Sequence, residues 1–182
     1  MNKTKGAATT FSSVCVLRDS SLLKRIKLIV LEGCFDSIES VLCERYGHFL
    51  GRKVLLPLIE TVCNFKNSGT SPSSLLHDFP MHIPVVFITS RKDNEVPSQN
   101  VMKLARDLAL QRSSQVDKQN IHTNDVYLLM LNNSAHPAFT CQDFQDWNQY
   151  QNFLHAIFKF YQLPYIEEYA KKGEHMLNIC RL

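Results

Sequence analysis

The chain has 182 residues, of which 45% are hydrophobic and 20% are charged, and its formal net charge is +3. This length suits a single domain spanning residues 1–182, or part of a larger protein. Basic and acidic residues are interspersed, which argues against a nucleic acid or another polyanion as partner. No apolar run reaches the length of a membrane span.

The cysteines and histidines show no metal-binding pattern. No CxxC pair and no zinc-ligand spacing occurs among the six cysteines, which stand at 15, 34, 43, 63, 141 and 180. They are typical of small, reduced core residues of a cytosolic protein, so we expect a cytoplasmic location and no disulfide framework. The histidines lack carboxylate or cysteine partners at ligand spacing, and we predict no metal and no cofactor.

The first half of the chain begins with a helix pattern and continues with a strand. Small residues at 6–10 open the helix, and residues 26–31 form an apolar run typical of a buried parallel strand. Asp36 or Ser37 is expected to cap a second helix. The predicted apolar face of that helix consists of Ile38, Val41, Leu42, Tyr46 and Phe49.

The second half repeats the alternation of strand and helix. A helical segment at 54–65 and a polar loop at 66–74 precede a strand at 85–89. Ser98 begins a helix with apolar residues at i, i+3, i+4, i+7 and i+8, and residues 112–124 are predicted to be polar and exposed. A strand at 126–131 and a long helix at about 143–161 follow. That last helix has a predicted apolar face of Phe144, Trp147, Leu154, Ile157, Phe158 and Tyr161, and the tail is expected to be a short helix or a loose end.

This order predicts an α/β protein with about three parallel strands and helices on both faces, which is a three-layer αβα arrangement. Polar turns follow the second and third strands, and open α/β sheets keep their sites beyond the carboxyl ends of strands. Asp93 lies in the first of these turns and His136 in the second. A carboxylate that fixes the tautomer of a histidine makes it a general base, so the pair is a candidate catalytic site.

Two other acids compete with Asp93 for the role of orienting the histidine. Glu95 lies two residues further along, but the Val96-Pro97 boundary favours Asp93. Glu32 follows the first predicted strand, and it is the runner-up acid. Each of these residues, like His136, also has the simpler interpretation of a solvated loop side chain.

Four segments resemble the α/β-hydrolase superfamily. Residues 93–97 are similar to the D-x-x-V-P turn after strand seven, and residues 134–136 to the histidine turn after strand eight. Residues 31–38 resemble the exit of strand six, and residues 6–9 the positions after the nucleophilic serine. The nearest members are serine aminopeptidases, dienelactone hydrolases and prolyl oligopeptidases. The resemblance covers the chain but only the C-terminal half of the family's fold, strands six to eight.

The resemblance implies serine-dependent hydrolysis of an ester or amide in the intact family, with Asp93 and His136 as acid and base. It also places Thr4 where the serine belongs, and Asn2 where the family has the first glycine of the tight turn. Because threonine is β-branched and suits that turn poorly, we predict that this chain alone is inactive. The motif-like stretch 69–73 is rejected, because it lacks the last glycine and a preceding strand.

Two alternatives to a truncated hydrolase remain. One is a non-catalytic binding or interaction protein derived from the same half of the fold. The other is a small flavodoxin-like protein, which lacks the support of a phosphate-binding glycine loop. If the chain is a truncated hydrolase or a binding protein derived from the same half of the fold, the strand at 26–31 has an unpaired edge, which invites association. The expected partner is a complementary N-terminal fragment or a second copy, with no nucleic acid and no membrane.

Overall fold

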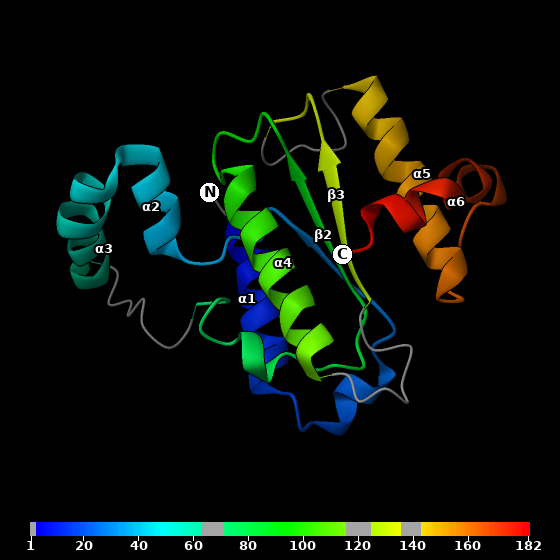
Figure 1. Cartoon of the computed structure of the whole chain (residues 1–182), viewed down its shortest axis with the longest axis horizontal. Helices are drawn as coiled ribbons and strands as arrows, with labels where there is room; N and C mark the ends of the chain where they lie inside the picture. Colours follow the sequence, from blue (N-terminus) through cyan, green and yellow to red (C-terminus); the bar gives the residue numbers. More distant parts are fainter. Residues whose placement is uncertain (1–2, 63–70, 116–124, 136–142) are drawn as a thin grey trace.

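The computed structural model describes residues 3–62, 71–115, 125–135 and 143–182 (Figure 1). It contains a parallel sheet of three strands, β1 (Ile29–Glu32), β2 (Val85–Ser90) and β3 (Val126–Leu131), in the order β1-β2-β3. Helices cover both faces of this sheet. The predicted α/β class and the three-layer arrangement are therefore confirmed.

The central strand is the most deeply buried part of the molecule. All residues of β2 are buried, because β1 and β3 pair with its two edges and helices cover its two faces. Val85 lies beside Ile29 on one side and beside Val126 on the other. An apolar, β-branched run suits this position, where no side chain meets water.

One face of the sheet is covered by α1 (Lys3–Val16) and α4 (Ser98–Gln115). Two short 3₁₀ helices, η1 (Ser21–Arg25) and η3 (Leu76–Asp78), lie at the margin of this layer. The predicted apolar stripe of α4 is confirmed as core. The buried hydrophobic residues of these two helices are Ala8, Phe11, Val14, Cys15, Val101, Leu104, Ala105, Leu108 and Ala109.

The other face is covered by α5 (Phe144–Phe160) and α6 (Glu167–Cys180), which pack against each other. Asp143 caps α5, since its side chain accepts the N–H of Asp146 at 2.9 Å. The tail of the chain forms α6, a long helix that packs against α5, where a short helix or a loose end was expected. Gly173 permits the contact between α5 and α6, because a Cβ there would lie 2.0 Å from the carbonyl oxygen of Asn152.

Between β1 and β2 the chain forms a helical arm that stands away from the sheet (Figure 1). The arm consists of α2 (Ile38–Tyr46), the π-helix η2 (Phe49–Leu55) and α3 (Leu56–Val62). The predicted apolar face of α2 is not part of the core, since no residue of α2 is buried, and Tyr46 and Phe49 are 47% and 78% exposed. The face meets the rest of the arm and not the sheet, which periodicity alone does not reveal.

Three further predictions are corrected by the structure. Arg112 was expected in an exposed segment, but it lies inside α4 with no exposed surface. Phe144 was expected in the core, but it is the first residue of α5 and 80% exposed. The strand predicted at 26–31 begins only at Ile29, because η1 and an extended residue, Ile26, precede it.

The prediction that the cysteines are core residues is confirmed for three of those that the structure describes. Cys15, Cys34 and Cys180 are buried free thiols, and Cys43 is a half-buried one. Cys63 and Cys141 lie outside the described residues. In the described part of the chain, the helices are all too short or too polar to cross a membrane.

Candidate functional site at the carboxyl edge of the sheet

The turns after β2 and β3 leave the sheet side by side. Ser90 and Leu131, the last residues of the two strands, are register partners. The N–H of Arg91 donates to the carbonyl of Leu131 at 2.9 Å, and its Nε donates to Oδ1 of Asn132 at 3.1 Å. Parallel pairing therefore brings the predicted acid turn and the predicted histidine turn to one edge, as the sequence indicated.

Asp93 is held by its own turn. Its Oδ1 accepts the backbone N–H groups of Glu95 at 2.9 Å and Val96 at 2.8 Å, and its own N–H donates to the carbonyl of Ser90 at 3.1 Å. The residue is 8% exposed. This local network fixes the carboxylate at the strand end, because the short side chain of aspartate can close such a turn on itself.

The turn after β3 is anchored by Asp146, in the first turn of α5. Its Oδ1 accepts the N–H of Asn132 at 3.0 Å, and its Oδ2 accepts the N–H groups of Asn133 and Ser134 at 2.8 and 2.7 Å. The Ser134 hydroxyl also donates to Oδ2 at 2.7 Å. Four donors from Asn132, Asn133 and Ser134 therefore converge on one buried carboxylate, and Ser134 directly precedes Ala135, the last described residue of this turn.

Burial alone would raise the pKa of Asp146, but the hydrogen bonds from Asn132, Asn133 and Ser134 outweigh it, and the pKa is lowered. The charged form thus holds the turn. Sequence reasoning missed this residue. The only signal was its place three residues after Asp143, where acids are common in a first helical turn, and that pattern does not show which loop the carboxylate binds.

The other residues predicted for the site have different outcomes. His136 lies outside the described residues. Thr4 is in the first turn of α1, and its side chain is not described. Glu95 is exposed and lies 3.8 Å from Arg45 as an ion pair. Glu32 is a register partner of Ile88, two residues before the end of β2, and it accepts a hydrogen bond from the Tyr150 hydroxyl.

A buried polar cluster lies after β1. Asp36 accepts the N–H of Ser37 at 2.8 Å, the hydroxyl of Ser40, and the amide Nδ2 of Asn100 at 3.2 Å. The same Nδ2 lies 2.8 Å from the Ser40 hydroxyl. These bonds join the start of α2 to the start of α4, so the cluster connects the helical arm to the body of the molecule.

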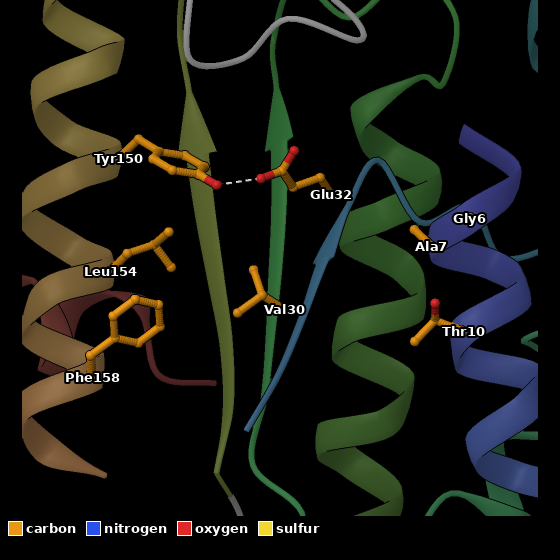
Figure 2. A pocket seen from close by; sticks show the side chains of 8 residues that line it. All are labelled: Gly6, Ala7, Thr10, Val30, Glu32, Tyr150, Leu154 and Phe158. Carbon is orange, nitrogen blue, oxygen red and sulfur yellow. Dashed lines mark hydrogen bonds between the residues drawn. The ribbon is translucent and has the colours of Figure 1, made fainter. Parts of the chain in front are cut away.

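A pocket of about 430 Å³ lies at the outer edge of β1 (Figure 2). One wall comes from α5 and the other from α1, and Val30 and Glu32 of β1 lie between them. Tyr150 points from α5 toward Glu32 at one end of the pocket. Burial raises the pKa of Tyr150, and the hydrogen bond to Glu32 raises it further, so the hydroxyl is the donor in this pair.

No group of three or more histidine, cysteine, aspartate or glutamate side chains suited to a metal ion occurs in the part of the chain that the structure describes. Comparison with known proteins gave no match, whether to family models, to curated proteins or to solved structures.

Proposed function

We propose that this chain carries the acid and the histidine of an α/β-hydrolase active site, with Asp93 orienting His136. In this proposal the carboxylate accepts the imidazole N–H, and the other ring nitrogen faces the edge of the sheet as a base. Thr4 takes the place of the nucleophilic serine, so the chain alone does not hydrolyse esters or amides.

The proposal is supported chiefly by the pairing of two fixed turns. Asp93 is immobilised by the backbone of its own turn, and Asp146 immobilises the neighbouring turn up to Ser134, two residues before His136. A general base needs its orienting acid within hydrogen-bond reach, which demands that both loops be held.

The interaction between Asp93 and His136 is tested by titrating His136 with NMR. A carboxylate partner stabilises the imidazolium and raises the histidine pKa. Asp93→Asn keeps an oxygen that can accept the two backbone N–H groups but removes the charge, so we expect the pKa of His136 to fall by roughly one unit. Glu95→Gln removes an exposed charge two residues away and serves as the matched control, with little effect on that pKa.

If the pKa of His136 is the same in the Asp93→Asn variant as in the unchanged protein, the two residues do not interact and the assignment is wrong. Inactivity has a separate test. A fluorophosphonate probe should leave the purified chain unlabelled, and covalent labelling at any serine would show a competent nucleophile that the proposal denies.

A binding role without catalysis is the second candidate function. The observation that favours it is the pocket beside β1, which is lined by apolar side chains and by the polar side chains of Thr10, Glu32 and Tyr150, and which contains neither Asp93 nor the turn after β3 (Figure 2). In this case the acid turn is a structural element, and the exposed edge of the sheet carries the function.

A further inference from the structure

The outer edge of β1 presents backbone groups that no described strand pairs with. Ile29 and Gly33 donate their N–H groups to carbonyls on the β2 side, at 3.0 and 2.9 Å. Because alternate residues of a parallel strand bond to opposite neighbours, the N–H and C=O groups of Val30 and Glu32 point the other way. Among the described strands β1 is an end strand, and this side faces the pocket.

The pocket lies where one more strand of the sheet would be. Its two walls belong to the two helical layers: Gly6, Ala7 and Thr10 come from α1, and Leu154 and Phe158 from α5. Figure 2 shows Val30 and Glu32 of β1 between these two walls, so the pocket lies beside the outer edge of the sheet. A strand lying there would be covered on both faces, as β2 is.

We propose that this pocket binds an extended segment of another polypeptide, which adds to the sheet as a strand parallel to β1. The inference specifies the partner for the second candidate function and does not depend on the triad. Hydrogen bonds to the backbone of Val30 and Glu32 would supply affinity, and the side chains that alternate between the two walls would supply selectivity.

The walls define the chemistry of that segment. Residues level with Val30 and Glu32 face α5, where Leu154 and Phe158 offer an apolar surface that suits valine or isoleucine. The residues between them face α1, where a Cβ added to Gly6 would meet nothing within 4 Å. This side therefore has room for larger apolar side chains such as leucine.

Charge favours an acidic residue at the start of the segment. The amino end of β1 follows three exposed cations, Lys24, Arg25 and Lys27. A parallel segment would begin beside these cations. Its last residue would lie near the Glu32 carboxylate, which favours a cation or a hydrogen-bond donor there.

A second copy of the chain fits the edge less well than an isolated strand. In a second copy, β1 is likewise flanked by α1 and α5, so its outer edge is less accessible than that of an isolated strand. The occupant we expect is therefore a segment that is extended and unpaired before it binds.

The test uses the whole chain and a synthetic peptide, Asp-Glu-Val-Leu-Val-Leu-Val-Lys, with hydrogen exchange followed residue by residue by NMR. At a peptide concentration ten times the dissociation constant, exchange of the Val30 and Glu32 amides should slow about tenfold. The amides of Ile29 and Leu31, which already face β2, serve as internal references and should not change.

Two matched controls separate strand addition from unspecific apolar binding. N-methylation of the leucine amides removes the N–H groups that would bond to β1 and should abolish protection, whereas N-methylation of the valine amides, which point away from β1, should retain part of it. In the protein, Thr10→Trp should block the pocket, whereas Thr9→Trp places the same side chain at the neighbouring exposed position outside the pocket lining.

Unchanged exchange of the Val30 and Glu32 amides at saturating peptide would overturn the inference, as would equal protection by the two methylated peptides. Protection that appears without peptide and grows with protein concentration would show that a second copy occupies the edge, which also contradicts it. None of these results affects the His136 titration, so the two proposals fail independently.

Discussion

Ser134 donates two hydrogen bonds to Asp146, one from its backbone N–H and one from its hydroxyl, both at 2.7 Å. This pair joins the turn after β3 to the first turn of α5. The negative charge also lies at the amino end of a helix, where it is favoured by the helix dipole. The position of the predicted histidine turn is therefore set by α5, in one of the helical layers, as well as by β3.

The Asp146 carboxylate should make folding stability depend on pH. Its folded-state pKa lies below the ordinary value of 3.8, so the unfolded chain takes up the proton more readily. The stabilisation is present above that ordinary value and is lost as the pH falls through the folded pKa. Urea unfolding of Asp146→Asn should show a loss of roughly 2–4 kcal/mol near neutral pH, from a broken network of charged hydrogen bonds.

The difference between Asp146→Asn and the unchanged protein should shrink as the pH falls below 3.8. Asp107→Asn is a suitable control, because Asp107 forms a solvent-exposed pair with Lys103 on α4. Its removal should change the free energy of unfolding by less than about 1 kcal/mol. A loss for Asp146→Asn that is equal at low and neutral pH would contradict the assigned role of the charge.

Arg112 should be one of the most sensitive positions for stability. Its guanidinium is fully buried, donates to the carbonyls of Pro80 and Ile83 at 2.9 and 2.8 Å, and lies over the ring of Phe79. Arg112→Ala leaves these carbonyls without donors and should cost about 3–5 kcal/mol in chemical unfolding. Arg106→Ala, at an exposed position of the same helix, should stay within about 0.5 kcal/mol.

Two glycines should respond to alanine with opposite signs. Gly6→Ala in α1 adds a Cβ in open space, so the better helix propensity of alanine should raise stability by roughly 0.5–1 kcal/mol. Gly173→Ala adds a Cβ that collides with the backbone of Asn152, so α5 and α6 must separate and stability should fall. Thermal unfolding of both variants checks this, and a higher midpoint for Gly173→Ala would refute the close packing.

The buried thiols should be chemically inert in the folded protein. Burial raises the pKa of Cys15 to about 12 and also raises that of Cys34, so neither forms the reactive thiolate at mildly alkaline pH. A thiol reagent followed by peptide mapping should leave both unmodified until the protein is unfolded in concentrated guanidinium chloride. Rapid modification of Cys34 in the folded state would show that α1 opens away from the sheet.

The sequence by itself determined the strands and most of the helices. The runs that form β2 and β3 are continuous and apolar, and that of β2 is also rich in β-branched residues, which is typical of strands buried on both faces. The period of α4 determined its buried stripe in the same way. Because parallel strands end at one edge, the placement of Asp93 beside the turn that leads to His136 also followed from local patterns, and their assignment to a hydrolase triad stays a prediction.

Only the tertiary structure decided what the polar residues bind and which apolar faces are covered. Arg112 and Asp146 look like ordinary helix-surface residues in sequence, because their acceptors and donors lie 12 or more positions away along the chain. The apolar face of α2 meets no sheet, and the outer edge of β1 opens into a pocket. A local pattern records the preference of a residue for burial, but the partner that buries it depends on how distant segments meet.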